Sequence, residues 1–183
     1  MLTNCHEGGL SYLSPRYGFA CDTVKLFEIV IASGEITQAY PPVTQGSDFF
    51  LPGKNEDLFQ ALKGGSNNFG IVTRIDFTTL AIGDIWGGPV TYNISEVPKA
   101  IEAFYNFNAA DPYDEYASTT QTVAYIEGRG LVGVNDFEYS KPVANPPAFA
   151  GWDAIPKISS NARIDKYKNI TDEHASFSPG GLR

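Results

Sequence analysis

Two glycine-rich stretches contain the residue types best suited to binding an anion through the main chain. The first runs from Gly8-Gly9 to Tyr17-Gly18, and the second is the sequence GGSNNFGIV at residues 64–72. Glycine lets main-chain N–H groups approach an anion closely, so a diphosphate is the kind of ligand that either stretch could bind. Neither contains a phosphate-loop lysine motif or the G-x-G-x-x-G turn of nicotinamide dehydrogenases. On spacing alone, Gly64-Gly65 is better explained as the end of a helix.

The cysteines and histidines indicate no metal or disulfide chemistry. The chain has two cysteines, Cys5 and Cys21, and two histidines, His6 and His174. Two thiols make no disulfide framework, and these four side chains make no convincing four-ligand metal set. We therefore predict no metal site, and we interpret Cys21 as a small buried hydrophobic residue.

The charge balance argues against a nucleic-acid partner. The chain has 13 Lys+Arg residues against 21 Asp+Glu and a net charge of -8, with no basic cluster. Binding to a phosphate backbone needs such a cluster. No apolar run approaches the length that spans a bilayer, and residues 1–6 lack the features of a signal peptide. We therefore expect no nucleic acid, no membrane and no export signal.

Two short patterns fit N-glycosylation acceptors, Asn93-Ile94-Ser95 and Asn169-Ile170-Thr171. They would matter only if a secretory signal preceded the chain. Patterns of three residues often arise by chance, so we favour that simpler explanation.

The elements that would position the glycine stretches form a first lobe. Residues 24–32 are rich in β-branched and aromatic side chains, and Ser33-Gly34 turns the chain into residues 35–39, which predicts a hairpin. Asn55 is suited to cap a short helix that ends at Gly64-Gly65. A half-buried strand is then expected within residues 69–80. Its alternation predicts that four side chains face one way: Ile71, Thr73, Ile75 and Phe77.

A glycine-rich connector at residues 83–89 separates this lobe from a second one. We expect a strand at residues 90–93, a helix at residues 95–106, and a hairpin of residues 119–127 and 131–139. Two short helices are expected after it, one from residue 146 and one from residue 171. Ser95 is suited to the helix N-cap, and the helix spacing predicts an inner face of Val97, Ile101, Phe104 and Tyr105. The sequence therefore predicts an α+β fold.

Short motifs occur along the chain in the order GGLS, SPRYG, ACDTV, EIVIASGEI and DLFQALKGGSNNFGIVTR. This order resembles the flavin-dependent oxidoreductases of the vanillyl-alcohol oxidase and berberine-bridge-enzyme type, particularly their fungal members. These enzymes have an FAD-binding domain of the p-cresol methylhydroxylase (PCMH) type. The motifs lie within residues 8–80, and residues 147–160 are similar to the substrate domain of the same group. The resemblance covers nearly the whole chain.

The resemblance implies a division at the connector. Residues 1–82 would form the second half of a PCMH-type FAD-binding domain, and residues 83–183 would begin an α+β substrate domain, an antiparallel sheet with helices. It also implies FAD contacts at Gly8, Gly9, Ser14, Tyr17, Gly18, Asp22, Val24, Gly70, Ile71 and Val72. We expect main-chain amides from both ends of the first lobe to converge on one FAD. For Asp22, a cap ahead of the strand is a nearly equal alternative.

The chain also departs from that family. The N-terminal subdomain that usually carries a flavin-linked histidine has no counterpart, and His6 and Cys5 do not match the residues that tether flavin. The C-terminal part that usually holds the tyrosine or acidic base has no counterpart either. We therefore name no catalytic residue and expect the chain to be a fragment. Full-length members are often secreted, but this does not assign a location to the chain.

Three functions remain open. The first is part of an oxidoreductase that oxidises an alcohol, a sugar or a secondary metabolite, with FAD as cofactor and oxygen as acceptor. The second is a non-catalytic fragment without tight flavin, in which exposed apolar surface and open sheet edges favour self-association. The third is cleavage of a carbohydrate by two of Asp111, Asp114 and Glu115. The third is poorly supported, because acidic clusters in loops are usually solvated surface.

Overall fold

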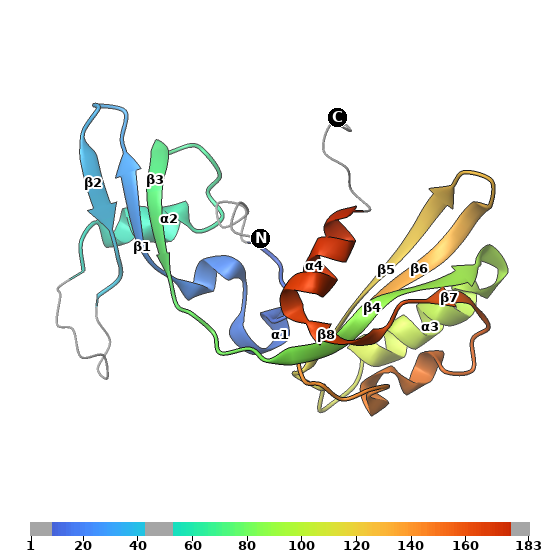
Figure 1. Cartoon of the computed structure of the whole chain (residues 1–183). Helices are drawn as coiled ribbons and strands as arrows, with labels where there is room; N and C mark the ends of the chain where they lie inside the picture. Colours follow the sequence, from blue (N-terminus) through green and yellow to red (C-terminus); the bar gives the residue numbers. More distant parts are fainter. Residues whose placement is uncertain (1–8, 43–52, 177–183) are drawn as a thin grey trace. The chain divides into compact units, whose positions relative to one another are not determined.

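The structure, a computed structural model, describes residues 9–42 and 53–176 (Figure 1). It divides into two compact units, residues 1–80 and residues 81–183. Each unit has its own antiparallel sheet and its own buried core. The α+β class predicted from the sequence is confirmed.

The first unit contains a three-stranded sheet with one helix packed on it. In the described residues its elements are α1 (Ser14–Tyr17), η2 (Ala20–Thr23), β1 (Val24–Val30), β2 (Ile36–Ala39), α2 (Glu56–Leu62) and β3 (Ile71–Phe77). The strand order is β2-β1-β3. The predicted hairpin is confirmed, with Gly34 at φ 85° in the turn between β1 and β2. Phe27 of β1 and Phe59 of α2 join the helix to the sheet, with ring centroids 5.6 Å apart.

A β-bulge in β3 changes which of its side chains face the core. Glu28 of β1 pairs with Arg74, and the next β1 residue pairs with Val72, so Thr73 is the extra residue. One extra residue reverses the alternation of a strand. Val72 therefore packs against the core, whereas Ile71 is 72% exposed. The predicted inward face is wrong at the start of the strand and correct at its end.

Asn55 precedes α2 but does not cap it with its side chain. Its side-chain amide donates to the Thr37 hydroxyl oxygen at 3.0 Å and to the Gln38 carbonyl at 2.9 Å. Asn55 therefore ties the helix start to β2. The predicted end of the helix is confirmed, since α2 stops at Leu62 and Gly64 follows with φ 79°.

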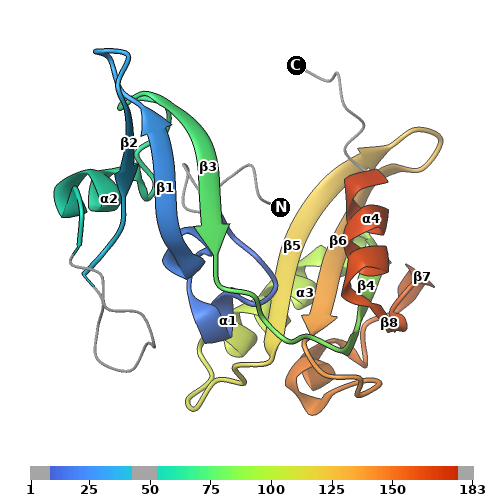
Figure 2. The ribbon, with the colours of Figure 1, turned by 60° about the vertical axis from the view of Figure 1, so that its left-hand side comes forward.

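The second unit contains a larger sheet with helices on both faces (Figure 2). In the described residues its elements are β4 (Asp84–Asn93), η3 (Ile94–Glu96), α3 (Val97–Asn108), β5 (Ala117–Ile126), β6 (Gly130–Tyr139), η4 (Pro147–Trp152), β7 (Lys157–Ser160), β8 (Arg163–Lys166) and α4 (Tyr167–Ser176). The strand order is β5-β6-β4-β7, and β8 also pairs with β4. The predicted β5–β6 hairpin is confirmed, with Gly128 and Gly130 at φ 77° and 79° in its turn.

The predicted connector at residues 83–89 is wrong, because most of it belongs to β4. One edge of β4 pairs with β6, while the other pairs with β8 over Asp84–Gly87 and with β7 over Val90–Tyr92. Pro89 lies between these two partners, where its missing N–H interrupts no ladder. Its carbonyl accepts a hydrogen bond from the Asn161 amide at 2.9 Å.

Aromatic side chains fill the space between the sheet, α3 and η4. Phe137 of β6 lies 4.9 Å from Phe149 and 5.2 Å from Trp152, measured between ring centroids. Trp86 of β4 stacks on Phe149 with centroids 5.8 Å apart. This cluster forms the core of the second unit.

The inner face of α3 is narrower than predicted. Ile101 and Tyr105 are 52% and 71% exposed, and the buried positions are Val97, Ala100 and Ala103. Small side chains let η4 approach the helix closely, so alanines replace the larger residues that the spacing favoured. The N-cap is Glu96 and not the predicted Ser95, because the 3-10 turn η3 precedes the helix.

The last helix, α4, begins at Tyr167, earlier than the predicted start at Thr171. It lies on the face of the sheet opposite α3, across β4 and β6 (Figures 1 and 2). β7 and β8, which precede it, were not predicted.

Candidate cofactor site

The chain ahead of β1 folds into a compact turn made of α1 and η2. The Gly9 carbonyl accepts a hydrogen bond from the Ala20 amide at 2.7 Å, and the Ser11 amide donates to the Ser14 hydroxyl oxygen at 3.0 Å. Gly18 ends α1 with φ 76°, a conformation that favours glycine. The turn contains the predicted contacts Gly9, Ser14, Tyr17, Gly18, Asp22 and Val24, and Gly8 lies outside the described residues.

Asp22 is part of this turn's internal bonding. Its carboxylate accepts a hydrogen bond from the Phe19 amide at 2.9 Å, which caps η2. Lys63 lies 3.7 Å from the same carboxylate. The alternative role predicted for Asp22, a cap ahead of the strand, is confirmed.

Most of the predicted contact residues in the turn use their main-chain amides to donate hydrogen bonds within the chain. The amides of Ser14, Gly18 and Asp22 donate to main-chain carbonyls at 2.9 to 3.0 Å, and the Val24 amide donates to the Cys21 carbonyl. They therefore differ from the free donors that a main-chain anion site requires. The Ser14 and Tyr17 hydroxyl groups remain as polar groups that could approach a cofactor.

Cys21 is the buried residue of η2 and is 6% exposed, as predicted for a small buried hydrophobic residue. Burial, followed by the nearby Asp22 charge, raises the pKa of its thiol. The thiol is therefore a packing group at neutral pH.

The second group of predicted contacts lies where β3 begins. Gly70 has φ 145°, and a Cβ there would overlap the Val30 carbonyl oxygen. Glycine at this position is thus required by the pairing of β3 with β1. Among the described strands, β3 pairs only with β1, so main-chain groups of alternate residues along its outer edge, which begins at Ile71 and Val72, point away from the sheet.

The two groups of contacts lie at opposite ends of the β1–β3 ladder. Val24 pairs with Phe77 at one end, and Val30 pairs with Ile71 at the other. Six residues of strand span about 20 Å at the usual rise. The set as a whole therefore cannot contact a single phosphate, and the expected convergence of both ends on one FAD stays a prediction. The arrangement fits an extended dinucleotide that meets the unit at two separate places.

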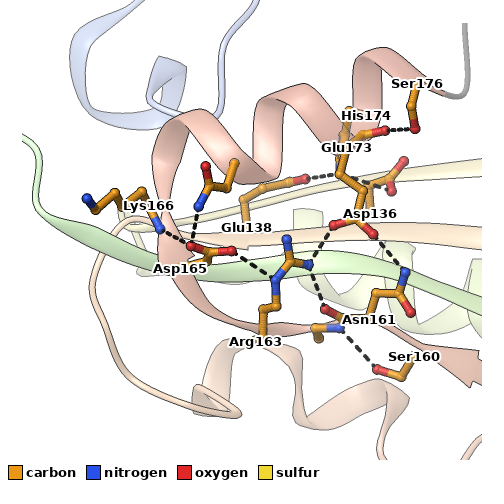
Figure 3. Close-up of polar contacts among 12 residues, drawn as sticks. Asp136, Glu138, Ser160, Asn161, Arg163, Asp165, Lys166, Glu173, His174 and Ser176 are labelled. Carbon is orange, nitrogen blue, oxygen red and sulfur yellow. Dashed lines mark hydrogen bonds and ion pairs between the residues drawn. The ribbon is translucent and has the colours of Figure 1, made fainter.

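A group of polar residues in the second unit was missed from the sequence (Figure 3). Asp136 and Glu138 are two residues apart on β6 and so share a face of the sheet. His174 of α4 lies over them, with its Nε2 atom 3.4 Å from Asp136 Oδ1 and 3.6 Å from Glu138 Oε1. Sequence spacing gave no signal, because His174 lies 36 residues after Glu138 along the chain (174 − 138).

The two carboxyl groups are in unusual surroundings. Glu138 is 1% exposed, and neither of its carboxyl oxygens accepts a hydrogen bond. Burial, followed by the Asp136 charge, raises the pKa of Glu138 well above its ordinary value. Burial also raises the pKa of Asp136, although the nearby His174 acts in the opposite direction. Within the described residues, no group of three or more His, Cys, Asp or Glu side chains is arranged to hold a metal ion.

Comparison with known proteins gives relatives over nearly the whole chain. No family model matches. The oligopeptidase PhomG' of Diaporthe leptostromiformis is 43% identical over 178 residues, covering 96% of this chain and 14% of that protein. The FAD-dependent monooxygenase elcE of Phaeosphaeria nodorum is 34% identical over 183 residues, covering 93% of this chain and 52% of that protein. The chain thus spans about half, or less, of the curated relatives it matches.

Solved structures share the fold. 6-Hydroxy-D-nicotine oxidase of Arthrobacter nicotinovorans matches 98% of this chain with a TM-score of 0.74 and 18% identity, and 38% of that protein is covered. The berberine-bridge-enzyme-like protein 1 of Physcomitrella patens matches 88% of this chain with a TM-score of 0.66 and 18% identity, and 32% of that protein is covered.

The resemblance predicted from the sequence is therefore confirmed. The chain is similar to part of a fungal protein named as an FAD-dependent monooxygenase, and it shares its fold with part of 6-hydroxy-D-nicotine oxidase and of a berberine-bridge-enzyme-like protein. In the part of the chain that the structure describes, no helix is both long and apolar enough to cross a membrane.

Proposed function

We propose that this chain is part of an FAD-dependent oxidoreductase. Residues 1–82 would be the second half of its FAD-binding domain, and residues 83–183 would begin its substrate domain. The observation that carries the proposal is the alignment of 93% of the chain with a fungal FAD-dependent monooxygenase, together with a fold shared with an FAD-family oxidase. The oligopeptidase name carries less weight, because the chain covers 14% of that protein.

The proposed flavin contacts occupy the two ends of the first unit. Near α1, the Ser14 and Tyr17 hydroxyls would meet the cofactor; near β3, the outer edge at Ile71 and Val72 would do so through the main chain. FAD, when bound, supplies the redox chemistry by taking electrons from a small-molecule substrate, an alcohol, a sugar or a secondary metabolite, and passing them to oxygen. The chain's own part is to bind and orient the cofactor, and no catalytic residue is assigned.

Titration with FAD tests this proposal. The 183-residue chain should shift the flavin absorbance band and quench its fluorescence. Ile71→Asp places a negative charge beside the proposed FAD contact on β3 at a 72% exposed position, and it should weaken binding of the anionic FAD about tenfold by charge repulsion.

Ile36→Asp is the matched control, because Ile36 is 67% exposed on β2 and strand β1 separates it from the edge of β3. It should leave FAD binding unchanged. A folded chain that gives a flat FAD titration, or equal losses in both variants, would contradict the proposed contacts.

The alternative is a non-catalytic fragment that binds no flavin tightly and associates with itself. The outer edge of β3 and the exposed side chains of Leu10 and Phe19, at 78% and 51%, favour this alternative. Size-exclusion chromatography with light scattering separates the two. Oligomers that form with or without FAD support the alternative, whereas a monomer that binds FAD supports the first proposal.

A further inference from the structure

α4 is held on the sheet by one face of the helix. Tyr167, Ile170 and His174 recur at helical spacing, and Ile170 is fully buried. Thr171 adds a hydrogen bond within the helix, from its hydroxyl to the Tyr167 carbonyl at 2.9 Å. His174 reaches two ionisable groups of β6, Asp136 and Glu138.

In this contact, the single imidazole of His174 faces two carboxyl groups, those of Asp136 and Glu138. The His174 side chain is 17% exposed, that of Asp136 24% and that of Glu138 1%. Gly87 of β4 pairs with Glu138, and a Cβ built at Gly87 would be 3.4 Å from Glu138 Cγ. A buried charge without sufficient compensation is costly, so the protonation state decides how well α4 binds.

We propose that α4 is a pH-responsive cover over this face of the sheet: the contact of His174 with Asp136 and Glu138 holds it in mildly acidic solution, and loss of protons from the two carboxyl groups loosens it as the pH rises. The proposal is independent of flavin binding. What α4 covers is the β6 surface that carries the two carboxyl groups.

The direction of the pH effect follows from the number of protons bound when α4 covers the sheet and when it does not. Burial raises the pKa of Asp136 and of Glu138, so both carboxyls hold protons more readily when α4 covers them. The covered state therefore binds more protons than the uncovered state, and raising the pH favours release.

The groups around Asp136, Glu138 and His174 do not reverse the direction of this pH effect. The other titratable or charged groups facing it are Tyr167 and Glu173 on α4 and Arg163 and Asp165 on β8. Burial, followed by the Glu138 charge, raises the pKa of Tyr167 to about 12, so this phenol stays neutral through the relevant range. The β4 and β5 residues opposite Asp136 and Glu138 carry no titratable group: they are Gly87, Pro89, Ser118 and Thr120.

A second anchor of α4 provides a control that does not depend on pH. Glu173 accepts hydrogen bonds from Arg163 at 2.5 Å and from Asn161 at 2.7 Å. Burial acts to raise the pKa of Glu173, but these hydrogen bonds and the Arg163 charge outweigh it and lower the pKa. Glu173 therefore stays ionised in neutral and mildly acidic solution.

Hydrogen exchange of the 183-residue chain tests the proposal. Protection of the amides of residues 167–176, corrected for the intrinsic pH dependence of exchange, should fall about tenfold or more between pH 6 and pH 8.5, which corresponds to one pKa unit of linkage. In Glu138→Gln, the fall should be less than about threefold. In Arg163→Gln, protection should drop by the same factor at both pH values. Amides of the β5–β6 hairpin serve as the internal reference for the folded sheet.

His174→Gln is the second variant, in case Glu138→Gln does not fold. It should show low α4 protection at both pH values. The proposal is overturned if wild-type protection is the same at pH 6 and pH 8.5. It is also overturned if either variant keeps the full dependence of the wild type.

Discussion

At the scale of single residues, Gly70 shows how a predicted ligand contact can have a structural origin. Its φ of 145° and the overlap of any Cβ with the Val30 carbonyl oxygen make glycine necessary for the β1–β3 pairing. The glycine would be needed there whether or not FAD approaches. A functional assignment for Gly70 therefore requires a measurement that separates binding from stability.

Gly70→Ala should lower the free energy of unfolding by about 2 kcal/mol or more, because the side chain adds both backbone strain and a steric overlap. Gly83→Ala is the matched control, since no atom lies within 4 Å of a Cβ built there. Its effect should stay within about 0.5 kcal/mol. Urea denaturation of the two variants measures the difference, and equal stabilities would show that β3 does not pair with β1 as described.

The residues of the α1–η2 turn illustrate a second point at this scale. Asp22 and Gly18 stand in a motif typical of a flavin site, yet their polar groups bond to neighbours in the chain. Such bonds fix the shape of the turn. A cofactor would therefore contact a turn that is already folded, through side-chain hydroxyl groups and not through free main-chain amides.

At the scale of elements, α4 depends on one buried side chain. Ile170 is fully buried against the sheet, whereas Lys168, on the outer side of the helix, makes only an exposed ion pair with Asp172. Ile170→Ala should cost about 2 to 4 kcal/mol of stability through the lost apolar contact and the cavity that remains. Lys168→Ala should cost less than about 0.5 kcal/mol. Thermal unfolding measures both, and similar losses would mean that α4 is not packed on the sheet.

Elements with strong side-chain patterns could be predicted, and those defined by their neighbours could not. The hairpins, α2 and most of α3 follow from periodicity and turn glycines. All four residues of β7 are exposed, so no alternation marks it as a strand. Gly87, Gly88 and Pro89 indicate a loop by composition, but β6 pairs with β4 through all three. The Thr73 bulge likewise depends on pairing with β1, which a single strand's sequence does not reveal.

For the same reason, only part of the candidate site could be predicted from the sequence. A motif such as SPRYG-x-ACDTV identifies the segment and its family, because order along the chain is what a sequence records. It does not record that Gly18 and Gly70 lie at different ends of one ladder. Nor does it bring His174 to Asp136 and Glu138, because that contact exists only after α4 has packed on β6.

At the scale of the whole molecule, each unit has a core made only of its own residues. The second unit contains the larger aromatic cluster, including Trp86, Phe137, Phe149 and Trp152. Residues 81–183 alone should therefore fold cooperatively, with a near-ultraviolet circular dichroism signal from packed aromatic rings. A non-cooperative thermal transition without that signal would show that this unit needs the first one.

Among the described strands of the second unit, β4 is the one that pairs with β6 and also with β7 and β8. Backbone cleavage between Gly88 and Pro89 would interrupt this strand between its pairing with β8 and its pairing with β7. Cleavage at the tip of the β5–β6 hairpin, by contrast, would leave every ladder intact. The natural place to divide this unit into two complementary pieces, or to relocate its termini, is therefore the turn around Arg129.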